Sequence, residues 1–300
     1  MAISGILLAI LCNVLWGTAI PFIKIGTKAL ELSSGIENQF FFAGLRFFLS
    51  GVMLFAYSLI KEKKIPTIKK ENRLNVFFIM LLGTILQYGF MYAGLLNTKS
   101  ADGNIFTSLS GFFTVILTPF FFKDDHFTIK KIVGVLIGLS GVLLISLKGT
   151  GIYLSLNGEV LLIIGTLCFV FSSFLTKKMG NKESALNITA YNLLLGGLAL
   201  LVTGIAMGGK FGKVTVSGIL CLLYLALLSA LAFTIWAYLL KIYKASSLGI
   251  FNLVNPVVGT ILAALVIGEE LEPLKYISAL LLVSIGIIII NSKEKKTQIS

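Results

Sequence analysis

Polar side chains recur at helical spacing inside a long apolar run near the N-terminus of the chain. Asn13, Trp16 and Gly17 stand at positions i, i+3 and i+4, so they fall on one face of a helix. An amide and an indole can exchange hydrogen bonds with a polar solute, and glycine lets another helix approach closely. We therefore expect Asn13 and Trp16 to line a binding cavity. The alternative is a hydrogen bond between helices for Asn13 and plain packing for Trp16.

Other apolar runs carry amides, phenols and indoles that could serve the same cavity. Tyr88 and Tyr92 are spaced i, i+4 and Asn252 and Asn255 i, i+3, so each pair shares a helix face. Asn104 either faces the cavity or merely begins its helix. Besides Asn13 and Trp16, the substrate-binding residues predicted from the sequence are Gln87, Tyr88, Tyr92, Asn104, Trp236, Asn252 and Asn255.

Two prolines interrupt apolar runs. Pro256 follows Asn255, removes a backbone donor and frees the carbonyl of Asn252. Such a break at membrane depth is tolerated beside protein or a water-filled cavity, which supports a cavity at Asn255. We predict that Pro21 bends its helix at a point that a gate could use.

Arg46 is a charged residue deep inside an apolar run. A charge in a membrane helix costs about 2.5–3.5 kcal/mol on insertion scales, so Arg46 is expected to face the bundle interior and to have a partner there. It either contacts an anionic group or latches a gate, or it pins helices together through carbonyls and hydroxyls. Lys24 lies near the end of its run, where its stem can carry the ammonium to the membrane interface.

The sequence offers little support for an enzyme. Nearly all carboxylates fall in predicted loops, so no central acid is available for a proton relay. The single histidine, His126 in "KDDHFTIKK", lacks the spacing of a metal site. No phosphate-binding loop of the Gly-Lys-Ser/Thr kind occurs, and the cysteines lie within apolar runs as packing residues. No catalytic residue, metal or cofactor is therefore predicted.

The composition places these residues in lipid. Hydrophobic residues make up 57% of the 300, charged residues 13%, and the mean hydropathy is +0.97, which is far from the soluble range. Runs of roughly 20 apolar residues are long enough to span a bilayer as helices. The sequence predicts an all-α polytopic membrane protein with ten transmembrane helices, at about 3–27, 36–60, 74–97, 102–122, 129–147, 158–179, 185–208, 214–241, 245–267 and 273–291.

The basic residues indicate the orientation. With the N-terminus in the cytoplasm, 17 of the 25 Lys and Arg residues fall on the inner side and 7 on the outer side. Both termini are therefore predicted to be cytoplasmic. This bias accounts for the net charge of +12 without nucleic acid. The expected partners are the lipid bilayer and a small-molecule substrate, for a monomer or a homodimer.

The two halves of the chain resemble each other. "KSADGNIFTSLSGFFTVIL" from Lys99 matches "KASSLGIFNLVNPVVGTIL" from Lys244, and the same offset places Asp124-Asp125 on Glu269-Glu270. We expect one five-helix repeat in 1–149 and a second in 150–300. Five is odd, so the second repeat would enter the membrane from the opposite side. Inverted repeats of this kind are typical of secondary transporters.

Four stretches point to a family: "NVLWGTAIPFIKIG" (13–26), "AGLRFFLSG" (43–51), "NPVVGTILAALVIGEEL" (255–271) and "SIGIIII" (284–290). In this order and spacing, the whole chain resembles the EamA-type, ten-helix transporters of the drug/metabolite transporter superfamily. It departs from them at Gly111, where the family often has proline, and at Lys123-Asp124, where a Gly-Glu element is usual. The 185–208 helix also has no counterpart of Arg46.

This resemblance implies a secondary transporter of the cell (inner) membrane. Similar proteins move small organic solutes and often export amino acids or related metabolites, so we expect export of such a compound by alternating access. An exporter of drug-like or nucleoside-type amphipathic solutes is the alternative within transport. The absence of a central acid argues against a dedicated exporter of multicationic drugs. Outside transport, a lipid scramblase or a membrane-embedded enzyme remains as the alternative.

Overall fold

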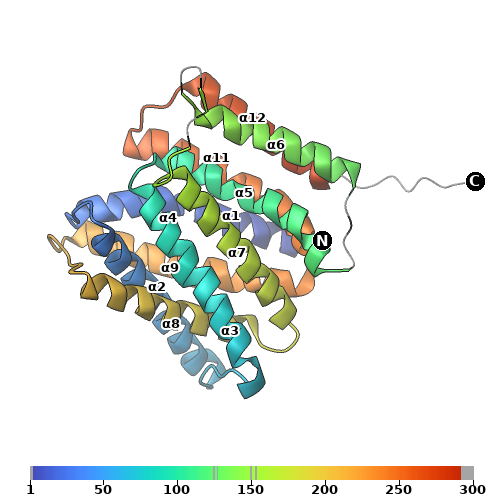
Figure 1. The fold of residues 1–300 in the computed structure, drawn as a ribbon. Helices are drawn as coiled ribbons and strands as arrows, with labels where there is room; N and C mark the ends of the chain where they lie inside the picture. Colours follow the sequence, from blue (N-terminus) through green and yellow to red (C-terminus); the bar gives the residue numbers. More distant parts are fainter. Residues whose placement is uncertain (1–2, 124–125, 127, 149–150, 153, 292–300) are drawn as a thin grey trace, which may run out of the picture.

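The computed structural model describes residues 3–123, 126, 128–148, 151–152 and 154–291. The described residues form ten helical rods, which confirms the all-helical membrane fold (Figure 1). Seven rods contain single α-helices: α1 Ile3–Ala29, α2 Ile36–Tyr57, α5 Ser100–Phe121, α6 Ile129–Ser146, α7 Glu159–Met179, α8 Ala185–Ala206 and α9 Val216–Ile242. An eighth, α12, covers Pro273–Asn291.

The other two rods change their helical geometry along their length. One combines the 3-10 turn η2 (Lys70–Asn72), α3 (Arg73–Met80), the π-helical segment η3 (Leu81–Leu86) and α4 (Gln87–Leu95). The other combines α10 (Ala245–Leu248), the 3-10 segment η4 (Gly249–Leu253), α11 (Val254–Leu262) and the π-helical segment η5 (Ala263–Ile267). A further π-helical segment, η1 (Ser58–Glu62), extends α2. Two-residue strands β1 (Leu147–Lys148) and β2 (Gly151–Ile152) pair antiparallel, Leu147 opposite Ile152.

The rods meet the requirements of a bilayer. Seven described helices are long and apolar enough to cross a membrane, and Val254–Ile267 and Pro273–Gly286 form shorter apolar helices. Large aliphatic side chains such as Leu7, Leu231 and Leu265 remain exposed around the bundle. A soluble monomer rarely exposes so much contiguous apolar surface, so this surface faces lipid.

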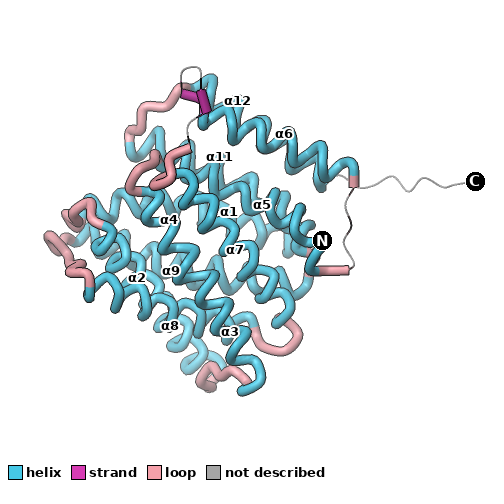
Figure 2. Tube along the Cα trace, in the orientation of Figure 1, coloured by secondary structure: helices cyan, strands magenta, loops and turns pink. Residues whose placement is uncertain are grey.

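Polar residues end the rods where the chain turns. The Ser184 hydroxyl accepts a hydrogen bond from the Asn187 N–H at the start of α8, and Thr215 accepts one from Gly218 at the start of α9. Pro273 opens α12, where its missing N–H costs nothing. Gly268 ends η5 with a φ of 74°, a conformation that glycine adopts without strain. The connecting loops gather at two opposite ends of the bundle (Figure 2).

Contacts between distant parts of the sequence hold the bundle together. α2 packs along α8, and α6 packs along α12; these pairs lie at opposite sides of the bundle (Figure 1). Between them, α1 packs on α9 and α11, while α7 packs on α4 and α5. A Cβ on Gly17 would lie 2.7 Å from the Asn255 carbonyl oxygen, so this glycine allows the close contact of α1 with α11. The middle of the bundle is therefore enclosed by α1, α4, α5, α7, α9 and α11.

Candidate functional site

A cavity of about 70 Å³ lies at the centre of this enclosure. One water molecule needs about 10–15 Å³ by a comparable measure, so the cavity can hold several waters or a small polar group. It is lined by Asn13, Trp16, Ala19, Ile20, Gln87, Tyr88, Met91, Thr107, Ser110, Leu162, Gly165, Thr166, Phe169, Phe233, Asn252 and Asn255. Six of the nine predicted binding residues are brought together here: Asn13, Trp16, Gln87, Tyr88, Asn252 and Asn255.

The cavity wall carries polar atoms that have no hydrogen-bond partner. They are Asn13 Oδ1, Trp16 Nε1, Gln87 Oε1 and Asn255 Oδ1, each buried. The Asn13 amide group is oriented, because its Nδ2 donates to the Ala9 carbonyl at 2.9 Å. Leaving a buried polar atom unpaired costs about 1–3 kcal/mol, so these four atoms favour a bound polar group. Three are acceptors and one is a donor, which suits a ligand rich in N–H donors.

Aromatic rings form one side of the cavity. The Trp16 ring lies edge-on to Phe169 and Phe233, with centroids 5.7 Å apart in both pairs, and to Trp236 at 5.1 Å. Phe233 also lies 6.2 Å from Tyr88. These rings make this side of the cavity apolar, and an apolar surrounding strengthens electrostatic contacts to the amide oxygens.

Three predicted binding residues do not line this cavity. Tyr92 is fully buried one turn beyond Tyr88, where its hydroxyl accepts a hydrogen bond from Arg46. Asn104 is also fully buried; its Nδ2 donates to the Ser100 carbonyl at 2.9 Å, and its amide packs against Gly259. Trp236 lines a second pocket on the far side of the aromatic rings.

Arg46 braces three helices behind the cavity wall. Its Nε donates to Ser229 Oγ at 3.0 Å and to the Leu225 carbonyl at 3.3 Å, and its Nη1 donates to the Tyr92 hydroxyl at 3.3 Å. The guanidinium carbon lies 4.8 Å from the centre of the Phe47 ring. No carboxylate pairs with Arg46 in the part of the chain that the structure describes. The partners of Arg46 are two hydroxyls and a carbonyl, as expected of a residue that holds α2, α4 and α9 together.

The two predicted gating prolines lie within helices. α1 stays helical through the buried Pro21, which is two positions from Ala19 and next to Ile20 in the cavity wall. Pro256 is buried near the start of α11, directly after the 3-10 segment η4. The missing N–H of Pro256 thus coincides with a change from 3-10 to α-helical geometry beside Asn252 and Asn255.

Lys24 has specific partners at the end of its helix, which the sequence did not predict. Its Nζ donates to the Thr98 carbonyl at 2.8 Å and lies 3.4 Å from Glu269 Oε1. The Glu269 carboxylate also accepts hydrogen bonds from the N–H groups of Ser100 at 2.8 Å and Ala101 at 3.2 Å. A carboxylate is stabilised there because the first N–H groups of α5 have no partner within the helix.

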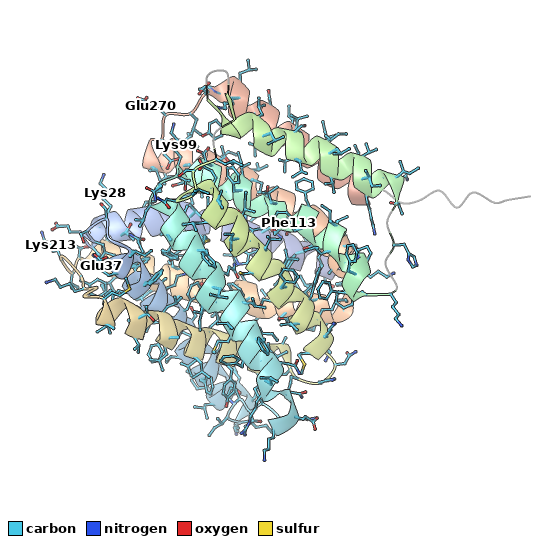
Figure 3. All side chains as sticks on the ribbon, viewed as in Figure 1. Lys28, Glu37, Lys99, Phe113, Lys213 and Glu270 are labelled. Atoms are coloured by element: carbon cyan, nitrogen blue, oxygen red, sulfur yellow. The ribbon has the colours of Figure 1, made fainter. Side chains whose placement is uncertain are left out.

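Two further contacts join the loop 268–272 and α12 to the start of α5. Lys99 Nζ donates to the Glu270 carbonyl at 2.7 Å, and the Tyr276 hydroxyl donates to Asp102 Oδ1 at 2.6 Å. Lys99 and Glu270 lie at the same end of the bundle as Lys28, Glu37 and Lys213, which is the predicted outer end (Figure 3). We call the contacts of Lys24, Lys99, Glu269 and Tyr276 the outer latch. The pair Asp124-Asp125, which the internal repeat aligns with Glu269-Glu270, lies outside the described residues.

The outer latch depends on a charged Glu269. Burial raises the pKa of this carboxyl, but the N–H groups of Ser100 and Ala101 and the Lys24 ammonium lower it more, so the pKa lies below its ordinary value of 4.5. A lowered pKa in the folded state means that the carboxylate stabilises the protein above about pH 4.5. This stabilisation is lost as the pH falls through the lower, folded-state pKa.

We therefore expect a specific pH dependence of the melting temperature. Glu269→Gln mimics the protonated carboxyl, so wild type should melt above Glu269→Gln by a constant margin from pH 7 to pH 5. Below about pH 4.5 the margin should shrink. Melting curves of the two purified proteins at matched pH test this, and a margin that shrinks already between pH 7 and pH 5 would contradict it.

Membrane-spanning helices around a central cavity with unpaired polar atoms define a class of protein, the multi-pass membrane proteins with an internal polar site. Comparison with known proteins gives the family. The model of the EamA-like transporter family matches residues 3–147 and 156–292, so the chain belongs to the EamA-like transporter family. It is accordingly a transporter rather than an enzyme.

Known proteins resemble the chain along most of its length. It is 26% identical over 286 residues to YedA of Escherichia coli (strain K12), an uncharacterized inner membrane transporter, covering 91% of this chain and 88% of YedA. It is 26% identical over 291 residues to a Salmonella typhimurium protein named a probable amino-acid metabolite efflux pump. The match covers 92% of this chain and 91% of that protein. A solved crystal structure has the same fold, with a TM-score of 0.72 at 18% identity. The match covers 95% of this chain and 96% of the solved one.

Proposed function

We propose that this transporter exports a small metabolite with a primary ammonium group, with amino acids as the leading class. The observation that carries the proposal is the set of unpaired acceptors Asn13 Oδ1, Gln87 Oε1 and Asn255 Oδ1 around one cavity. An ammonium group offers three donors and matches three amide oxygens. The name of the Salmonella typhimurium relative supports the same substrate class and direction.

We also propose that residues 1–149 and 150–300 form an inverted repeat. The packing supports this. The first helix of the first half, α1, contacts α9 and α11 of the second half, and the first helix of the second half, α7, contacts the corresponding α4 and α5 of the first half. Two hydrogen bonds are also similar, although the lysines are 153 residues apart and the acceptors 145: Lys24 Nζ donates to the Thr98 carbonyl, and Lys177 Nζ donates at 2.9 Å to the Tyr243 carbonyl. Two such halves could open a central cavity to either side in turn.

The outer latch is the proposed closure on the outer side, with both termini in the cytoplasm. Lys24, Thr98 and Ser100 come from the first half and Glu269 from the second, so the carboxylate holds the two halves together at one end. Separating the halves there would break the contacts of Glu269 and open the cavity to the outside. Glu269 is accordingly proposed to favour the outward-closed state.

Transport in liposomes tests the proposal. Purified protein should move at least one labelled amino acid faster than empty liposomes do, whereas nucleosides and a cationic drug should move slowly. Lipid flipping without movement of any solute would support a scramblase and contradict the proposal. Movement of the drug or a nucleoside alone would contradict the amino-acid class.

Removing a cavity acceptor should weaken substrate binding. Asn13→Ala and Asn255→Ala each delete an amide oxygen facing the substrate, and a hydrogen bond to a charged group contributes about 1.5–3 kcal/mol. We expect KM for the transported amino acid to rise by about tenfold or more. Asn187→Ala is the matched control, because the Asn187 amide donates to the Thr67 carbonyl in an exposed contact outside the central cavity. Equal effects of the three substitutions would contradict the assignment of the cavity.

A further inference from the structure

A second pocket lies on the predicted cytoplasmic side of the central cavity, and the proposed function does not account for it. It lies between the inner halves of α7, α8 and α9 and the end of α3. Its lining residues are Ile79, Phe169, Ser172, Ser173, Thr176, Ile188, Thr189, Asn192, Phe233, Trp236, Ala237 and Leu240. Five of these carry hydroxyl or amide groups at membrane depth, where such groups hydrogen-bond between helices or offer contacts to a polar solute.

One aromatic layer separates the two cavities. Phe169 and Phe233 line both of them, while Trp16 faces the central cavity and Trp236 the inner pocket. Trp16 contacts the other three rings, with centroids 5.1–5.7 Å apart. Trp16 and Trp236 each have a buried indole N–H with no hydrogen-bond partner. An unpaired donor therefore belongs to each of the two cavities.

The rod that passes both cavities is π-helical between them. Ile79 of α3 lines the inner pocket, Gln87 and Tyr88 of α4 line the central cavity, and η3 (Leu81–Leu86) joins α3 to α4. Polar residues of the inner pocket hold this rod, because Ser172 Oγ donates to the Ile79 carbonyl at 3.1 Å and Thr84 Oγ1 donates to Asn192 Oδ1 at 2.8 Å. π-Helical turns are rare and often mark functional sites.

We infer that the inner pocket is the cytoplasmic vestibule of the substrate path and that Trp16, Phe169, Phe233 and Trp236 are its barrier. The inference rests on the proposed transport function. The described lining is uncharged and rich in hydroxyls, which suits a small zwitterion rather than an ion of high net charge. The pocket measures about 30 Å³ in this structure, room for about two waters, so it must widen before a solute enters. In the widened vestibule, the Trp236 N–H donates to the carboxylate of the solute, and the ammonium faces the hydroxyl oxygens of Ser173 and Thr189. Rotation of the barrier rings connects this position with the central cavity.

Chemical labelling tests the vestibule without knowledge of the substrate. In a variant with Cys12, Cys168 and Cys221 replaced by alanine, Ser173→Cys should react with a charged, membrane-impermeant methanethiosulfonate added from the cytoplasmic face. Tyr238→Cys is the control, because Tyr238 is 49% exposed on the lipid side and lies nearer the end of its helix than Ser173 does. We expect Ser173→Cys to react at least tenfold faster than Tyr238→Cys. Equal rates, or reaction of Ser173→Cys only from outside, would overturn the inference.

A second measurement separates this inference from the proposed function. Ser173→Leu should block the vestibule and reduce amino-acid flux at least tenfold, whereas Tyr238→Leu, at an exposed position outside both pockets, should keep at least half of the wild-type flux. Trp16 and Trp236 are the two tryptophans of the chain, so intrinsic fluorescence reports on the barrier alone. A mixture of the non-aromatic amino acids should still shift the emission of Ser173→Leu, which shows that the variant is folded and binds at the centre.

The outcomes have distinct meanings. If wild type moves no amino acid, the proposed function fails, and the labelling rates alone decide the vestibule. If wild type transports and Ser173→Leu transports equally well, the vestibule is wrong and the proposed function stands. If Ser173→Leu melts like wild type but loses both flux and the fluorescence shift, while Tyr238→Leu keeps both, Ser173 belongs to the central site and the inference is likewise overturned.

Discussion

Gly44→Ala should lower the melting temperature of the purified protein more than other substitutions that add one methyl group. A Cβ on Gly44 in α2 would overlap the backbone nitrogen and Cα of Leu201 in α8. A backbone cannot rotate away as a side chain can, so the two helices must separate along their length. Overpacking usually costs about 1–3 kcal/mol, and we expect at least the upper value here. This corresponds to a fall of roughly 6–12 °C.

Three other glycines make the same interface tight: Gly51, Gly197 and Gly204. The matched control is Gly89→Ala in α4, where the nearest atom to an added Cβ is Phe40 Cζ at 4.0 Å. Alanine favours a helix over glycine by about 1 kcal/mol, so Gly89→Ala should leave the melting temperature unchanged or raise it. Similar effects of Gly44→Ala and Gly89→Ala would contradict the close packing of α2 on α8.

Glu269→Gln should open the transporter toward the outside. The substitution removes the charge that attracts Lys24 and the N–H groups of Ser100 and Ala101. Losing one hydrogen bond to a charged group costs about 1.5–3 kcal/mol, which shifts the balance between outward-closed and outward-open states by about 10- to 150-fold. The measurement is the rate at which an impermeant thiol reagent labels Thr107→Cys in the cavity wall from the outside.

Glu270→Gln is the control for the outer latch. Glu270 neighbours Glu269, yet it takes part through its backbone carbonyl, which accepts the hydrogen bond from Lys99. Its substitution should therefore leave the labelling of Thr107→Cys unchanged. If Glu270→Gln and Glu269→Gln accelerate labelling equally, the effect is due to surface charge and the outer latch is refuted.

The sequence predicts the fold well because the bilayer imposes it. Hydrocarbon thickness sets the length of each apolar run, so the expected segment 36–60 agrees with the observed Ile36–Glu62 and 74–97 with Lys70–Leu95. The π-helical segment η3 could not be predicted in the same way. Its surroundings include Ser172 and Asn192, which are far away in the sequence.

The site could be predicted where helical periodicity decides the outcome. Asn13 and Trp16 share a face and line one cavity, as their spacing indicates. Periodicity does not distinguish depth, however: Tyr88 and Tyr92 share a face, but Tyr92 lies one turn further on and contacts Arg46. The role of Glu269 depends on a contact with Ser100, 169 residues earlier, for which a single sequence gives no signal.

The partners of Arg46 have a consequence for biosynthesis. When α2 enters the membrane, Ser229 and Leu225 have not yet been translated, because they follow Arg46 by about 180 residues. Until α9 is inserted, the Arg46 guanidinium lacks two of its three hydrogen-bonding residues. Tyr92 is the one that is translated before α9. The first five helices translated alone should therefore be recognised by membrane quality control, and release from it should coincide with the insertion of α9.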